Sequence, residues 1–180
     1  MKYALLFFSL ISFSAMAQQD SLQRFPDINA NTLDRQSVQL PRDVNRKVNI
    51  LILVFEKQAQ LLVNTWAEVI LKEFEPQADI SYMEVPMMSG WWSPIGWQID
   101  NWMRDGIPEQ YHDNTATFYG NRSSFFKGLA IEDQSSCYLF VLDEEGYIHH
   151  RAEGPMKEDG EQALRVAIDR LMNDENLSDK

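Results

Sequence analysis

The sequence contains almost no cysteine, since Cys137 is the single cysteine among 180 residues. One thiol cannot form an internal disulfide, so a disulfide framework is excluded and a redox-active cysteine pair is missing. Cys137 opens an apolar run, residues 137–142, and burial in such a run disfavours ionisation of a thiol. We therefore predict that Cys137 is a structural residue and not a catalytic one.

Positive charge is also scarce, because 16 Lys and Arg face 27 Asp and Glu and leave a formal net charge of −11. Binding a nucleic acid requires a basic patch that displaces counterions from the phosphates. Attraction to an anionic membrane surface requires basic residues as well. We predict no nucleic-acid partner, and we attribute the acidic balance to solubility.

Long hydrophobic runs are absent after the first residues of the chain. Lys2 precedes a mostly apolar stretch, residues 5–13, and Ala15-Met16-Ala17 has the small-x-small pattern of a cleavage site. This pattern predicts a signal peptide over residues 1–17, and the alternative of a membrane anchor is disfavoured because the apolar stretch is too short. We expect a periplasmic or secreted protein with no membrane insertion after signal cleavage.

The remaining chain shows no internal repeats and no second domain. Residues 18–24 are polar and predict a flexible lead-in, whereas Phe25-Pro26-Asp27 starts the ordered domain. This domain is predicted over residues 25–172. The last residues, 173–180, are acidic and polar and predict a disordered tail.

The domain is organised around residues 48–55, an apolar run without alternation that indicates a strand covered on both faces. A helix follows, because apolar residues including Trp66 and Ile70 recur at helical spacing until Pro76. A second strand is predicted over residues 80–85. A second helix begins at Ser93-Pro94 and ends at Gly106, with a buried stripe that consists of Ile95, Ile99, Trp102 and Met103.

The second half of the chain continues the alternation of strands and helices. Residues 115–119 predict a short edge strand, and residues 123–129 a short helix. Residues 137–142 and 147–151 predict a hairpin whose turn contains Gly146, and residues 157–172 a last helix. Strands joined by helical crossovers run parallel, so we expect an α/β fold whose hairpin adds an antiparallel pair.

This order of elements resembles the thioredoxin-like fold in its peroxiredoxin-type version. The entry at residues 25–27, the Leu40-Pro41-Arg42 approach to the central strand and the hairpin at residues 140–148 carry that resemblance. More narrowly, residues 55–66, 99–108 and 138–154 resemble the family of the mitochondrial ATP synthase Fo assembly factor, ATPase complex subunit ten. The resemblance implies a central mixed sheet of about five strands, helices on both faces, and a role in assembly.

The sequence departs from its redox-active relatives at two places. By spacing from Phe55, the two cysteines of thioredoxin would fall near Gln60 and Val63. By spacing from Gly146, Cys137 takes the place of the proline that usually lies beside the active site. A thiol peroxidase also requires a cysteine after the central strand, so we predict a non-redox protein that is not an enzyme and has no cofactor.

A soft-metal site is the main alternative chemistry, because copper favours methionine, cysteine and histidine. The available residues are Met87, Met88, His112, His149 and His150. They show no recognised ligand spacing, and the adjacent His149 and His150 point to opposite faces of a strand. We predict no metal site. Asp100 and Asp105 lie on different faces of a helix and do not indicate carboxylate catalysis.

The best candidate for function is the segment after the second strand, which carries Met87, Met88, Trp91 and Trp92. Ligands gather at the carboxyl ends of parallel strands, and exposed tryptophan and methionine are typical of protein-contact surfaces. The alternative is that this loop folds inward over the sheet edge. We therefore predict an assembly-assisting module that binds a protein or peptide. A thiol-dependent oxidoreductase or a copper carrier that uses Cys137 remains the alternative.

Overall fold

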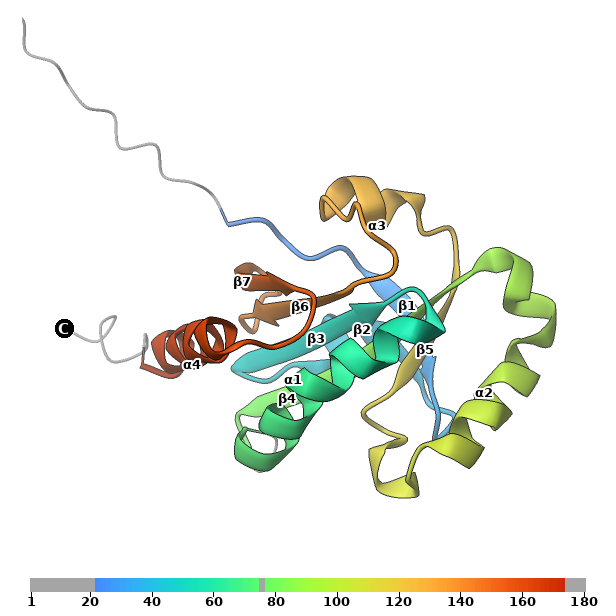
Figure 1. Cartoon of the computed structure of the whole chain (residues 1–180), viewed down its shortest axis with the longest axis horizontal. Coiled ribbons are helices and arrows are strands. Elements are labelled where there is room, and N and C mark those ends of the chain that lie inside the picture. The colour runs from blue at the N-terminus through green and yellow to red at the C-terminus, as the bar shows by residue number, and fades with distance from the viewer. Residues whose placement is uncertain (1–21, 75–76, 174–180) are drawn as a thin grey trace, which may run out of the picture.

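The computed structural model describes residues 22–74 and 77–173 and shows an α/β fold built on one mixed sheet (Figure 1). The sheet has seven strands in the order β2-β1-β5-β4-β3-β6-β7. About five strands were predicted. The two additional strands are β1 (Ile28–Thr32) and β2 (Ser37–Leu40), a short antiparallel hairpin at one edge.

The central strand is β3 (Val48–Val54), and every one of its residues is buried. It pairs in parallel with β4 (Ile80–Ser89) and antiparallel with β6 (Cys137–Leu142). A strand covered on both faces has no position for an exposed polar side chain, which explains why six of its seven residues are apolar. The exception, Asn49, is buried and donates to the carbonyls of Arg46 and Asp143. The predicted central strand, its parallel neighbour and the antiparallel hairpin strand are confirmed.

The prediction that residues 115–119 form an edge strand is wrong. The observed strand β5 (Ala116–Gly120) runs parallel to β4 on one side and pairs antiparallel with β1 on the other. Strand β1 was hidden from the sequence analysis because Asn29 and Asn31 interrupt its apolar residues, and both asparagines are exposed. The edges of the sheet are instead β2 and β7 (Ile148–Glu153).

One face of the sheet is covered by the two longest helices, α1 (Gln60–Glu73) and α4 (Glu158–Asn173) (Figure 1). Trp66 and Ile70 of α1 pack with Leu164 and Ile168 of α4 above the even-numbered residues of β3. The indole N–H of Trp66 donates a hydrogen bond of 2.8 Å to the carbonyl of Gly154. The prediction that Trp66 belongs to the core is confirmed.

The opposite face carries the short helix α3 (Ser123–Gly128) and the segment that precedes β1. Phe25, Phe125 and Leu129 pack there against Leu51 and Phe140 of the central strands. Helices therefore lie on both faces, as predicted. The remaining helical elements are η1 (Arg42–Val44), η2 (Lys57–Ala59), η3 (Gly90–Ile95), α2 (Gly96–Gly106) and η4 (Glu109–Tyr111).

Strand β4 continues past Pro86, where the sequence analysis ended it. Proline has no N–H to donate to a neighbouring strand. On the β5 side of β4, Glu84 bridges Thr115, and the pairing with β5 then starts at Met87. Pro86 is the register partner of Val54 in β3 on one side and falls between Glu84 and Met87 on the other side, where β5 is not paired with it. Met87 and Met88 are therefore strand residues and not loop residues.

The second helix also begins later than predicted. Ser93 and Pro94 lie inside the 3₁₀ helix η3, and the α-helical part starts at Gly96. Neither Ser89 before η3 nor Ile95 before α2 makes a side-chain capping hydrogen bond. The prediction of a Ser93 cap with proline at the first helical position is therefore wrong, because the segment is a 3₁₀ turn that leads into α2.

The predicted signal peptide, residues 1–17, and most of the lead-in lie outside the described residues, as does the predicted tail after Asn173. Gln23 and Arg24 are described, and they are bound to the domain. The side chain of Gln23 donates to the Gly128 carbonyl, and Arg24 bridges Tyr147. Within the described ranges, no helix is long and apolar enough to cross a membrane.

Candidate functional site

The carboxyl ends of three parallel strands meet at one edge of the sheet, where β3 ends at Val54, β4 at Ser89 and β5 at Gly120. An open groove of about 620 Å³ lies along this edge. Its walls come from the end of β4, from η3, from the end of β5 and from the start of α3. The lining residues are Ser89, Gly90, Trp91, Pro94, Gly120, Asn121, Arg122, Ser123 and Phe126. The groove therefore lies where parallel sheets usually bind their ligands.

Arg122 is the charged residue of this groove, and its guanidinium holds two strand ends together. Nη1 donates to the carbonyls of Phe55 at 3.4 Å and Met87 at 3.1 Å, while Nη2 donates to Gln134 at 3.1 Å. The guanidinium carbon also lies 5.8 Å from the centre of the Phe55 ring and 5.6 Å from that of Phe126. These contacts fix the cation in one place at the edge of the sheet.

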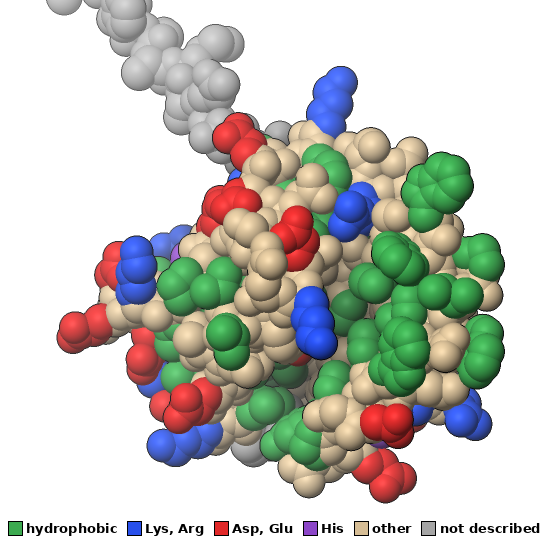
Figure 2. Space-filling view, turned by 45° about the vertical axis from the view of Figure 1, so that its right-hand side comes forward, with side chains coloured by type: hydrophobic (Ala, Val, Ile, Leu, Met, Phe, Trp, Pro, Cys, Tyr) green, Lys and Arg blue, Asp and Glu red, His purple; other side chains and the backbone are tan. Residues whose placement is uncertain are grey.

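Next to the groove, η3 and α2 expose a group of large apolar side chains. Trp91 is 92% exposed, Trp97 67%, Trp102 61% and Trp92 50%. Together with Ile95 these exposed side chains of residues 91–102 are what we call the tryptophan surface, and Figure 2 shows hydrophobic side chains gathered on this side of the molecule. Four of the five tryptophans lie on it, whereas Trp66 is in the core.

Helix α2 is held to the sheet by polar contacts and by one close approach. The Tyr119 hydroxyl lies 2.8 Å from the Asp100 carboxylate and 3.0 Å from the Gly96 carbonyl. A Cβ atom at Gly96 would come within 3.0 Å of the Tyr119 ring, so only glycine lets the helix approach so closely. Burial, followed by the bond to Asp100, raises the pKa of Tyr119, so the hydroxyl stays protonated and can donate.

The structure separates the four predicted binding residues. Trp91 and Trp92 are exposed, and the alternative that this segment folds inward does not apply to them. Met87 is fully buried in the core beneath α3, and Met88 is partly buried on the opposite face of β4. Adjacent strand residues point to opposite faces, so the two methionines cannot belong to the same surface.

The sequence analysis missed part of the tryptophan surface. Ile95 and Trp102 were predicted as part of a buried stripe and are exposed, so that prediction is wrong for both. Trp97 was not singled out, because its position on the helix does not fall on the apolar stripe. The density of tryptophan between residues 91 and 102 was the available signal.

Gln60 and Val63, which spacing from Phe55 predicts near the position of the thioredoxin cysteines, lie in the first turn of α1, and Val63 is buried. Below this helix start lies Glu84 of β4, a carboxylate that is only 8% exposed. Burial raises the pKa of Glu84, while a hydrogen bond from the Gln60 side chain lowers it. An amide and a buried carboxyl group are therefore found where the spacing predicts the redox centre of thioredoxin.

Cys137 lies in β6 and is fully buried. Its thiol lies 3.2 Å from the Gly154 carbonyl, to which it can donate. Burial raises the pKa of Cys137 to about 11, which leaves on the order of 10⁻⁴ of the thiol ionised at pH 7. The thiolate is the nucleophile and the metal ligand, so this cysteine is poorly suited to either role.

The residues considered for copper are spread over the fold. His112 follows η4, where Nε2 lies 2.8 Å from the Ile107 carbonyl. His149 and His150 lie in β7, which is separated from the methionines of β4 by two strands. Among the described residues, no group of three or more His, Cys, Asp or Glu could hold a metal ion.

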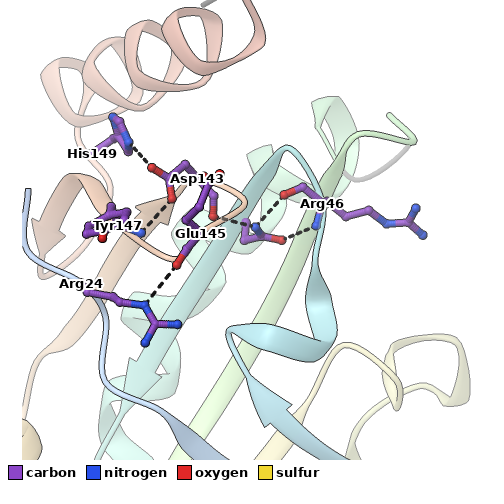
Figure 3. A network of polar contacts seen from close by, with 7 residues as sticks. Arg24, Arg46, Asp143, Glu145, Tyr147 and His149 are labelled. Atoms are coloured by element: carbon purple, nitrogen blue, oxygen red, sulfur yellow. Dashed lines mark hydrogen bonds and ion pairs between the residues drawn. The ribbon is translucent and has the colours of Figure 1, made fainter. Parts of the chain in front are cut away.

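A second, smaller pocket lies at the opposite end of the strands, beside the turn between β6 and β7. Figure 3 shows the polar network of this turn, in which His149 contacts Asp143 at 2.7 Å and Arg24 donates to the Glu145 carbonyl. Asp143 also accepts from the backbone N–H of Tyr147, so its carboxylate closes the turn. These contacts satisfy one another, which indicates a structural role.

Solved structures share this fold at low sequence identity. The exposed lipoprotein thioredoxin Etrx1 of Streptococcus pneumoniae is 14% identical with a TM-score of 0.53, covering 80% of this chain and 99% of its own. BsSco, a member of the Sco family of cytochrome c oxidase assembly proteins, is 10% identical with a TM-score of 0.56, covering 84% and 95%. An uncharacterized conserved protein from Geobacillus kaustophilus is 14% identical with a TM-score of 0.55, covering 84% and 82%.

These likenesses show a thioredoxin-like fold, as predicted. No curated protein sequence matches the chain. The family model described as ATP10 protein matches residues 7–171, which is most of the 180 residues. The chain therefore belongs to the ATP10 family.

Proposed function

We propose that this protein is an exported, non-redox thioredoxin-like module that assists the assembly of a protein complex. It binds one protein of that complex through the tryptophan surface. The observation that carries this proposal is the exposure of Trp91, Trp92, Trp97 and Trp102 on one short segment beside the carboxyl edge of the sheet. Tryptophan is enriched among the residues that dominate protein interfaces, and large exposed apolar groups mark interaction sites.

Membership of the ATP10 family supports the assembly role, since the sequence resembles the ATP synthase Fo assembly factor. Subunits of an ATP synthase are therefore the first partners to test. The structural likeness to BsSco is consistent with this proposal, because that protein belongs to a family of cytochrome c oxidase assembly proteins. The same fold thus occurs in another assembly family.

The environment of Cys137 supports the non-redox part. A buried thiol with a pKa of about 11 is a poor nucleophile at neutral pH. We expect the mature protein neither to reduce insulin disulfides nor to consume peroxide above the rate in buffer. Turnover that disappears in Cys137→Ser would establish the oxidoreductase alternative, and a one-to-one Cu(I) complex lost in the same variant would establish the copper carrier.

Export rests on the sequence of residues 1–17, with its positive start, apolar run and Ala15-Met16-Ala17 site. N-terminal sequencing of the protein from a periplasmic fraction should give Gln18 as the first residue. A protein found in the cytoplasm with residues 1–17 intact would contradict this part of the proposal.

The assembly role is tested in cells that lack the protein. We expect less assembled ATP synthase in these cells, restored by the wild type but not by the variant with Trp91, Trp92, Trp97 and Trp102 changed to alanine. Leu61→Ala is the matched control, because Leu61 is 74% exposed on α1 away from this surface. Normal assembly without the protein, or full rescue by the tryptophan variant, would refute the proposal.

A further inference from the structure

The groove at the carboxyl edge holds Arg122, which forms no ion pair with a carboxylate of the residues that the structure describes. Within residues 22–74 and 77–173, the acceptors of Arg122 are two backbone carbonyls and the neutral side chain of Gln134. By contrast, Arg165 on α4 is paired with both Glu73 and Glu161. In a chain with 27 acidic and 16 basic residues, the partly buried Arg122 has only neutral acceptors, as has Arg104, which bonds to the Leu33 carbonyl and Asn101 outside the groove.

The contacts of Arg122 also leave hydrogen-bonding capacity unused. A guanidinium carries five N–H donors. In the described part of the chain, two donors on Nη1 and one on Nη2 have acceptors. The N–H of Nε and the second N–H of Nη2 remain, and Arg122 lines the groove. One carboxylate can accept from two nitrogens of a guanidinium, which is the strongest arrangement of such a pair.

The walls around Arg122 suit an apolar side chain. Trp91, Pro94 and Phe126 line the same groove, and Phe126 is packed against Phe55 with ring centres 5.2 Å apart. The rest of the lining is small or neutral, including Ser89, Gly90 and Gly120. The groove is open rather than enclosed, so an extended chain can pass through it.

We propose that this groove binds an extended segment of a partner protein in which an Asp or Glu side chain pairs with Arg122 and a neighbouring apolar side chain packs on Trp91 and Phe126. The inference rests on the proposed function and says which side chains the partner must present, one acidic and one apolar. A phosphate group fits less well, because phosphate sites collect several donors and this groove offers a single cation within an acidic protein.

The ionic contact is tested with two tetrapeptides that differ in one group. N-acetyl-Gly-Phe-Glu-Gly-amide carries the carboxylate, and N-acetyl-Gly-Phe-Gln-Gly-amide replaces it with an amide of the same shape. Because a hydrogen bond to a charged group contributes about 1.5–3 kcal/mol, we expect the Glu peptide to bind about ten to a hundred times more tightly. Titrations follow the intrinsic tryptophan fluorescence and, independently, NMR shifts of the full mature protein.

Two variants separate the ionic contact from the fold. Arg122→Gln should abolish the preference for Glu, but it also removes the contacts that join β3 and β4 and could unfold the protein. Asn121→Asp is the second variant, because Asn121 is exposed in the groove and its Oδ1 accepts from the Ser123 N–H, as an aspartate oxygen would. The new carboxylate competes for Arg122, so Asn121→Asp should remove most of the preference while the fold is kept.

Arg46→Gln is the matched control, since it removes the same charge outside the groove and should leave the preference unchanged. Equal binding of the two peptides would overturn the inference, while leaving the proposed assembly role to its own test in cells. No binding of either peptide at about 1 mM would overturn it as well. So would tighter binding of N-acetyl-Gly-Gly-Phe with a free terminal carboxylate, because the groove would then capture chain ends. Loss of cellular rescue in the tryptophan variant would still support the proposed function in any of these cases.

Discussion

Helices α1 and α2 both follow a strand of the parallel part of the sheet, yet their tryptophans have opposite surroundings. Trp66 of α1 is 2% exposed and donates its indole N–H to the Gly154 carbonyl. Trp97 and Trp102 of α2 are 67% and 61% exposed. Helix α1 lies between the sheet and α4, whereas the buried residues of α2 are Gly96 and Asp100.

This difference shows that the apolar residues of a helix are buried only where another element packs against them. A Cβ atom at Gly160 of α4 would lie 3.1 Å from the Trp66 ring, so the two helices approach closely at that point. Helix α2 contacts the sheet through Gly96 and Asp100, and both residues are bonded to the hydroxyl of Tyr119. Its large side chains, Trp97 and Trp102, are therefore left exposed.

The largest effect is expected for Trp66→Ala. The change removes a buried aromatic ring and leaves the Gly154 carbonyl without the indole N–H. Loss of a large aromatic side chain from a core costs about 3–5 kcal/mol of unfolding free energy. Urea denaturation of this variant beside Trp97→Ala measures both sides of the comparison. Similar losses for the two variants would mean that α2 is packed as tightly as α1.

A smaller effect is expected for Tyr119→Phe, which removes the hydroxyl that ties α2 to the sheet. Asp100 is 8% exposed and would lose its 2.8 Å partner. A buried polar group left without a partner costs about 1–3 kcal/mol. Hydrogen exchange should show faster opening of α2 than in the wild type, while α1 is nearly unchanged. Equal acceleration in both helices would show that α2 does not open separately.

The pH dependence of stability tests the α1 side of this comparison through Glu84, which lies on β4 below the start of α1. Burial raises the pKa of this carboxyl above its ordinary value of 4.5. The folded state therefore holds its proton longer than the unfolded state, and Glu84 costs stability as the pH rises from about 4.5 through the folded pKa. Below that window the cost is absent.

Glu84→Gln removes this titration while keeping an amide that can bond to Gln60. We expect the variant to be more stable than the wild type at pH 7 and to lose that advantage near pH 4. The gain should be smaller than the loss in Tyr119→Phe. Thermal melting across this pH range measures it. An advantage that is the same at every pH would show that the effect comes from packing and not from the charge.

The sequence predicts the part of the fold in which local patterns and tertiary contacts agree. The almost wholly apolar run of β3 has one physical explanation, burial on both faces, and the helical spacing around Trp66 matches a helix that is covered. Gly146 adopts a φ of +84°, which glycine readily supplies, so the hairpin could be placed from its turn.

The exposure and attachment of α2 and the position of Arg122 could not be predicted, because they depend on contacts between residues far apart in the chain. The stripe of Ile95, Ile99, Trp102 and Met103 has helical period, but a period does not say whether another element covers the face. The attachment of α2 through Tyr119 involves a residue 19 positions beyond Asp100 and leaves no local pattern. Arg122 is likewise an ordinary arginine in the sequence, and only the fold brings it to the carbonyls of Phe55 and Met87.

The smallest effect on stability is expected for the double change Trp91→Ala and Trp92→Ala. Trp91 is 92% exposed and Trp92 50%, so their removal exposes little new surface. Surface substitutions usually stay within about 0.5 kcal/mol, which for a protein of this size shifts the melting temperature by about 2 °C per residue changed. If these indoles were core residues, each change would cost about 3–5 kcal/mol and the protein would unfold.

The same double variant should have its large effect on binding. Tryptophans at the centre of an interface typically contribute about 2 kcal/mol or more each, so a partner that binds the wild type should be lost from the variant. A variant that melts normally and loses its partner places the function on the segment that carries Trp91 and Trp92. A variant that melts normally and keeps its partner would leave Trp97 and Trp102 of α2 as the side chains that bind.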